Sequence, residues 1–111
     1  MKKLYLNLLN SINGLKIGFK EHSFIFEILG GLILIPYLIF SNLNNEFKLI
    51  IISIYFILLA FELLNTSIEK LSDRISKDFD PDIKKIKDLS SASVFVIITL
   101  FFILLFISLL I

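Results

Sequence analysis

Glu62, Asn65 and Glu69 interrupt and then follow a long apolar stretch of the chain. They are three and four positions apart. On an α-helix they therefore share one face, with the two carboxylates about 10 Å apart along the axis. Mg²⁺ takes oxygen ligands and often bridges carboxylate to phosphate. A carboxylate placed deeper in a membrane can accept a proton from a lipid hydroxyl, so this face is a candidate for Mg²⁺ binding and proton transfer.

Other charged residues are expected at the same depth. Glu21 and Glu27 flank the start of an earlier apolar segment, and the pair Lys87–Asp88 stands just before the last one. A lysine beside carboxylates suits phosphate oxygens. The polar stretch between adds a set of further carboxylates: Asp73, Asp78, Asp80 and Asp82. No GxxxxGK[ST] or GxGxxG motif is present, so any nucleotide site is not a standard one.

Each of these groups also has a simpler interpretation. Glu62 can pair with a basic group in a structural helix contact. Glu21 and Glu27, near an interface, can simply be solvated. Lys87 and its neighbours can serve only to orient the chain in a membrane.

The composition indicates the class of protein that must position these residues. Apolar residues make up 57% of the 111 residues and charged residues 19%, and the mean hydropathy is +0.91. A small soluble domain could not bury so much apolar surface, and disordered chains are poor in such residues. The chain has no cysteine, which excludes disulfides and thiolate catalysis. The net charge of +1 gives no reason to expect a nucleic acid partner.

Three apolar segments, about 24–41, 47–69 and 89–111, are long enough to span a membrane. Each is expected to be helical, because lipid offers no partner for unpaired backbone groups. The predicted fold class is therefore all-α integral membrane, with residues 1–111 forming one domain. Gly30 and Gly31 lie inside the first span and would allow close approach of another helix.

The segment 1–20 differs from the spans. Its apolar residues recur at helical spacing, with polar and basic residues between them: Leu4, Leu8, Leu9, Ile12 and Leu15. This pattern predicts an amphipathic helix on the membrane surface. Of the eleven basic residues, only Lys48, at the start of the second span, lies on the opposite side of the membrane from the rest. The positive-inside rule then places the N-terminus and a loop over 70–88 in the cytoplasm and the C-terminus outside.

The run 62–73 reads Glu-Leu-Leu-Asn-Thr-Ser-Ile-Glu-Lys-Leu-Ser-Asp. It resembles the signature of the prokaryotic diacylglycerol kinase and undecaprenol kinase family, Glu-x-hydrophobic-Asn-Ser/Thr-small-aliphatic-Glu-x-x-Val-Asp, with Ser72 where Val is usual. The family's Glu and Phe at the first span are matched by Glu21 and Phe24, and its Lys-Asp pair by Lys87–Asp88. Two features depart from the family: Ile25 stands where Arg is usual, and the segment before Glu21 is one residue shorter.

The resemblance implies a homotrimeric bundle in the bacterial inner membrane that transfers the γ-phosphate of Mg-ATP to a lipid alcohol at the cytoplasmic face. It implies that Glu62 is the catalytic base, and that Asn65 supports the acidic pair. The residues implied for binding are Glu21 and Glu69 for Mg²⁺; Glu21, Glu69, Lys87, Asp88, Asp78, Asp80 and Lys3 for ATP; and Glu27, Glu62 and Ser91 for the lipid substrate.

Two substrates of the family compete. The Asp73–Arg74 pair and the run Ser90-Ser91-Ala92 are closer to the diacylglycerol branch, which carries Asp-Arg and Gly-Ser-Ala there, so we expect a diacylglycerol kinase, with undecaprenol as the alternative. From other classes, a non-enzymatic membrane protein such as a holin-like or assembly subunit has no need of the costly acidic face. A proton- or ion-conducting oligomer would explain Glu62 but leaves Lys87–Asp88 unexplained.

Overall fold

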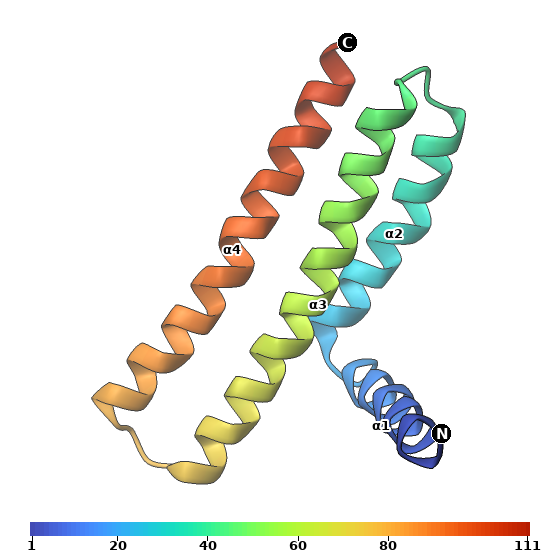
Figure 1. Ribbon diagram of the computed structural model, residues 1–111. Coiled ribbons are helices and arrows are strands. Elements are labelled where there is room, and N and C mark those ends of the chain that lie inside the picture. Colours follow the sequence, from blue (N-terminus) through green and yellow to red (C-terminus); the bar gives the residue numbers. More distant parts are fainter.

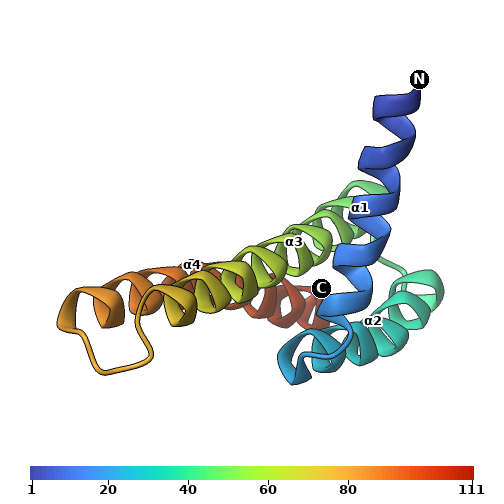
Figure 2. The same cartoon turned by 90° about the horizontal axis from the view of Figure 1, so that it is seen from below.

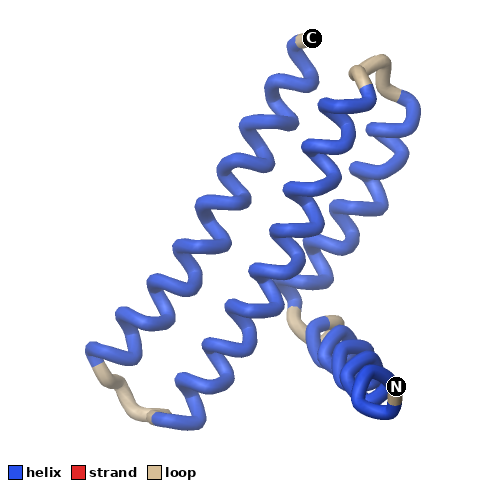
Figure 3. The backbone as a smooth tube through the Cα atoms, viewed as in Figure 1, coloured by secondary structure: helices blue, strands red, loops and turns tan.

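The computed structural model describes residues 1–111 and contains four α-helices and no strands. The helices are α1 (Lys2–Gly18), α2 (His22–Phe40), α3 (Asn45–Ile75) and α4 (Pro81–Leu110). Helices α2, α3 and α4 run side by side with α3 in the middle (Figure 1). Helix α1 leaves the N-terminal end of α2 at a steep angle to the other three (Figure 2). The connections between helices are all short (Figure 3).

Helices α2, α3 and α4 are each long and apolar enough to cross a membrane. This confirms the expected all-helical class with three candidate spans. Each predicted span corresponds to one of these helices. Helix α3 continues past the apolar segment 47–69 at its C-terminal end, and α4 begins before the apolar segment 89–111. Their polar ends form a helical hairpin that projects past the start of α2 (Figure 1).

The prediction of a loop over 70–88 is wrong in extent, because only 76–80 lie outside the helices. Helix α3 continues through polar residues to Ile75. Helix α4 begins early because Asp80 is its N-cap, with a carboxylate oxygen accepting from the backbone N–H groups of Asp82 and Ile83 at 2.9 and 3.3 Å. Pro81 follows at the first helical position, where a missing N–H costs nothing.

The core lies where α3 meets its two neighbours. Its buried apolar residues come from all three long helices: Phe24, Leu34, Leu38, Ile51, Tyr55, Leu59 and Phe101. A Cβ atom on Gly31 would overlap the hydroxyl group of Tyr55, whereas one on Gly30 would meet nothing. The expected close approach at the paired glycines therefore holds for Gly31 and fails for Gly30.

Helix α1 lies against the rest of the chain along its C-terminal part. Gly18 is its one buried residue, and Leu63 of α3 lies against it. The rings of Phe19 and Phe24 meet edge to face, with centroids 5.4 Å apart, at the corner between α1 and α2. The apolar residues of the predicted amphipathic face, such as Leu4 and Leu8, are exposed. This face has no protein partner in the chain, as expected for a helix that lies on a membrane surface.

Candidate active site

The acidic face of α3 forms the centre of the site. Glu62 and Asn65 are buried, with 6% and 9% of their surface exposed, although both lie on a helix that is largely apolar. Glu69, one turn further, is exposed. The side-chain Nδ2 of Asn65 donates to Glu69 Oε1 at 3.1 Å. The same helix face therefore carries one carboxylate in the buried interior, Glu62, and a second near the exposed hairpin, Glu69.

A second carboxyl group joins this face from α2. The carboxyl group of Glu27 lies near that of Glu62. One oxygen of the Glu27 carboxyl group, Oε2, is buried and has no hydrogen-bond partner. Neighbouring carboxyl groups are a feature of acid–base sites. From the sequence, Glu27 was assigned to the lipid substrate, and its pairing with Glu62 was not foreseen.

An apolar groove of about 470 Å³ begins at Glu27 and runs between α2, α3 and α4. Its walls are mostly aliphatic and aromatic, and Phe26, Leu58 and Phe102 are among them. Towards the C-terminal end of α4, the hydroxyl groups of Tyr37 and Ser108 are hydrogen-bonded at 2.8 Å. The groove thus places an unpartnered carboxylate oxygen at one end of an apolar channel.

The charged residues of the hairpin pair with one another. Lys87 of α4 bridges to Asp73 of α3 at 2.5 Å. Lys84 and Asp88 form an ion pair within α4 at 2.8 Å. The Lys84–Asp88 pair is largely exposed and the Lys87–Asp73 pair partly exposed, so their contribution to stability is small, at about 0–1 kcal/mol each. The Lys87 ammonium group therefore lies between the two helices of the hairpin, and breaking its ion pair costs little free energy.

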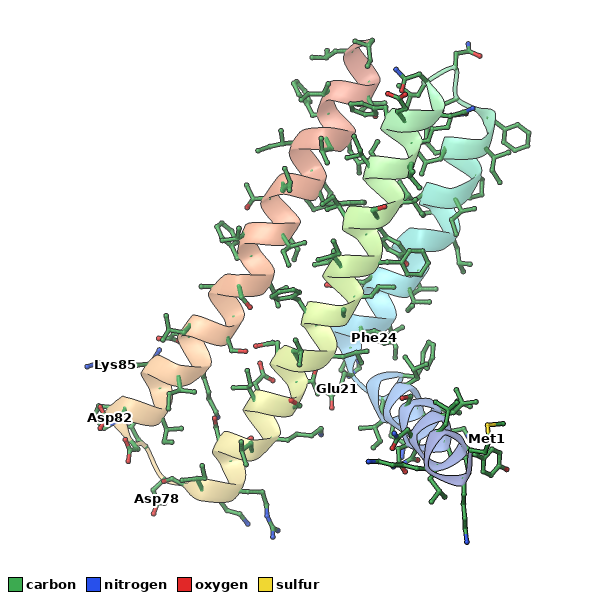
Figure 4. All side chains as sticks on the ribbon, viewed as in Figure 1. Met1, Glu21, Phe24, Asp78, Asp82 and Lys85 are labelled. Carbon is green, nitrogen blue, oxygen red and sulfur yellow. The ribbon has the colours of Figure 1, made fainter.

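Glu21 is the N-cap residue of α2 and lies at the corner between α1 and α2 (Figure 4). Its carboxylate pairs with Lys70 of α3 at 3.1 Å. Lys70 directly follows Glu69, so Glu21 pairs with the residue next to Glu69 on α3. No group of three or more His, Cys, Asp or Glu side chains gathers anywhere in the chain. The chain therefore offers no all-protein metal cage, whereas a magnesium ion that takes most of its ligands from nucleotide phosphates and water needs only one or two carboxylates.

The remaining sequence-predicted residues lie further out. Lys3 is exposed on the first turn of α1, and Ser91 is exposed on α4. Asp78 lies in the 76–80 connection at the tip of the hairpin, away from Glu21 (Figure 4). Asp80 caps α4, so one oxygen of its carboxylate is already engaged.

Two residues of the site were missed by sequence reasoning. Tyr55 donates its hydroxyl hydrogen to the backbone carbonyl of Glu27 at 2.9 Å. Ser90 donates to the side-chain oxygen Oδ1 of Asn65 at 2.7 Å. The available signal was a polar group at a buried position, but the sequence alone does not show which helix faces which.

Two comparisons with known proteins place the chain. Residues 9–109 match the family described as prokaryotic diacylglycerol kinase. A protein named diacylglycerol kinase from Haemophilus influenzae is 37% identical over 87 residues, which cover 78% of this chain and 74% of that protein. The family match extends from α1 to the last turns of α4, and so includes the three apolar helices and the acidic face. The resemblance in the 62–73 run is thereby confirmed, and the chain is a multi-pass membrane protein that belongs to the prokaryotic diacylglycerol kinase family.

Proposed function

We propose that the protein transfers the γ-phosphate of Mg-ATP to the hydroxyl group of diacylglycerol, giving phosphatidic acid. The reaction takes place at the cytoplasmic face of a bacterial inner membrane. Family membership and the name of the Haemophilus influenzae relative support a lipid kinase. The observation that carries the proposal is the buried Glu62 carboxyl group, which stands beside Glu27 between an apolar groove and a charged hairpin.

The lipid end of the site is the groove. Its apolar walls suit an acyl chain, and Glu27 at its start suits the polar head of a lipid alcohol. A hydroxyl group bound there lies next to Glu62. Ser91, exposed on α4, is a further candidate for contact with the lipid head.

The nucleotide end is the hairpin. We assign the ATP phosphates to Lys87, with Asp88, Asp78, Asp80 and Lys3 bordering the nucleotide. Lys87 must leave Asp73 to reach phosphate, and the exposure of that ion pair makes the exchange inexpensive. Glu21 and Glu69 would hold Mg²⁺, which when bound neutralises phosphate charge. Glu21 must then share or release Lys70.

The reaction needs positioning and charge compensation more than covalent catalysis. Glu62 accepts the proton of the lipid hydroxyl as that oxygen bonds to the γ-phosphorus. The bond between the γ-phosphorus and the β–γ bridging oxygen breaks, and ADP leaves with the electron pair. Lys87 offsets the negative charge on the phosphate oxygens. Asn65 holds Glu69 through the 3.1 Å hydrogen bond.

Diacylglycerol is proposed over undecaprenol because Asp73–Arg74 and the 90–92 run follow the diacylglycerol branch. We also propose a homotrimer with the N-terminus inside and the C-terminus outside. Many large apolar side chains of the long helices are exposed, such as Phe40, Phe95 and Phe106, and these can face lipid or a second copy.

The test is transfer of labelled γ-phosphate from Mg-ATP in mixed micelles that offer diacylglycerol and undecaprenol side by side. Labelled phosphatidic acid from the wild type is the expected product. Labelled undecaprenyl phosphate instead would keep the mechanism and overturn the substrate. If the folded protein labels neither lipid, the proposed kinase activity is wrong.

A further inference from the structure

A continuous chain of hydrogen bonds runs from α4 through α3 to Glu69. The Ser90 hydroxyl donates to Asn65 Oδ1 at 2.7 Å, and Asn65 Nδ2 donates to Glu69 Oε1 at 3.1 Å. Ser90 is 8% exposed and Asn65 is 9% exposed, so water has little access to the middle of this chain. The two residues are 25 positions apart and come together only because α3 and α4 pack along their length.

The chain fixes which way the Asn65 amide points. An amide group has nearly the same shape in its two flipped orientations, and its partners decide between them. An ionised Glu69 can only accept hydrogen bonds, so Nδ2 must face Glu69. Oδ1 then faces α4 and needs a donor. The Ser90 hydroxyl is the donor that the structure provides.

We infer that Ser90 is a positioning residue whose hydroxyl locks the Asn65 amide and, through it, holds the Glu69 carboxylate in the orientation used for Mg-ATP. Only the identity of the ligand that Glu69 binds, Mg-ATP, rests on the proposed function. The hydrogen-bond chain itself does not depend on any activity.

Ser93 gives a matched control one turn along α4. Its hydroxyl donates to the backbone carbonyl of Ser90 at 2.6 Å, within its own helix, and does not touch Asn65 or Glu69. Replacing Ser93 by Ala removes the same group from the same helix and leaves the chain to Glu69 intact.

The experiment compares Ser90→Ala, Ser90→Thr and Ser93→Ala with the wild type in two assays. The first measures KM for Mg-ATP, KM for the lipid and kcat. Loss of one neutral hydrogen bond in Ser90→Ala should raise KM for Mg-ATP by about 3- to 10-fold, with KM for the lipid unchanged. Ser90→Thr, which keeps a hydroxyl, should restore most of the loss, and Ser93→Ala should match the wild type.

The second assay needs no turnover. It follows the NMR signal of the ¹⁵N-labelled side-chain amide of Asn65, identified by its loss in Asn65→Leu. Ser90→Ala should shift or broaden this signal, and Ser93→Ala should leave it in place. An unchanged signal in Ser90→Ala would overturn the positioning role even in an active enzyme. A shifted signal in a protein that phosphorylates neither lipid would keep the positioning role and overturn the proposed function.

A double-mutant cycle separates positioning from a general effect on packing. If Ser90 acts only through Asn65, Ser90→Ala should add nothing to KM for Mg-ATP in an Asn65→Leu background. Independent, multiplying effects of the two substitutions would show that Ser90 acts by another route.

Discussion

The hydroxyl group of Tyr55 donates to the backbone carbonyl of Glu27 at 2.9 Å, in the space that Gly31 leaves open. This bond joins α3 to α2 at the residue whose carboxyl group faces Glu62. The contact is possible only because position 31 has no side chain. The close packing of Tyr55 on Gly31 therefore helps to hold Glu27 against α3.

Substitution Gly31→Ala should drive α2 and α3 apart, because the new Cβ atom would overlap the Tyr55 hydroxyl and ring. Overpacking of this kind costs about 1–3 kcal/mol. Thermal or denaturant unfolding in micelles measures the loss. Gly30→Ala is the matched control, since a Cβ there meets nothing. Equal stability of the two variants would show that the approach at Gly31 is not tight in the membrane.

Substitution Glu62→Gln should abolish phosphoryl transfer while the protein still assembles. The amide keeps the size of the side chain but cannot accept the hydroxyl proton, and general-base catalysis contributes about 10²- to 10⁴-fold. Labelled phosphate transfer and size-exclusion chromatography measure the two properties. Glu46→Gln changes an exposed glutamate at the other end of the same helix and should retain activity. Normal turnover by Glu62→Gln would remove Glu62 from the mechanism.

Substitution Lys87→Ala should weaken the use of Mg-ATP with little change in stability. The Lys87–Asp73 pair is partly exposed, and surface pairs contribute about 0–1 kcal/mol. We expect at least about a tenfold rise in KM for Mg-ATP, because the variant loses one charge-assisted contact to phosphate. Lys85→Ala removes an exposed lysine on the same turn and serves as the control (Figure 4). A parallel loss in both variants would indicate a general charge effect.

The proposed orientation can be tested with single cysteines, because the chain has none of its own. Lys77→Cys lies in the connection between α3 and α4, and Asn42→Cys lies in that between α2 and α3. A membrane-impermeant thiol reagent added to intact cells should label only Asn42→Cys. Labelling of Lys77→Cys in intact cells would reverse the orientation derived from the basic residues.

Much of the architecture follows from local pattern. The length and composition of the apolar segments are enough to predict three spanning helices, because the interior of a membrane requires backbone groups to bond within the helix. Helical periodicity likewise places Glu62, Asn65 and Glu69 on one face, and the Asn65–Glu69 hydrogen bond agrees with it. The 62–73 run, together with Glu21, Phe24 and the Lys87–Asp88 pair, led to the family that the match over residues 9–109 confirms.

The tertiary structure decided what periodicity cannot express, namely how each helix is rotated against its neighbours. Glu27 faces Glu62, and Ser90 reaches Asn65, only because side chains far apart in sequence pack across helix pairs. Most of the 70–88 segment is a helical hairpin and not a loop, because capping by Asp80 starts α4 well before its apolar part. Local spacing determines which residues share a face of one helix, whereas the partner of that face depends on the fit of whole helices.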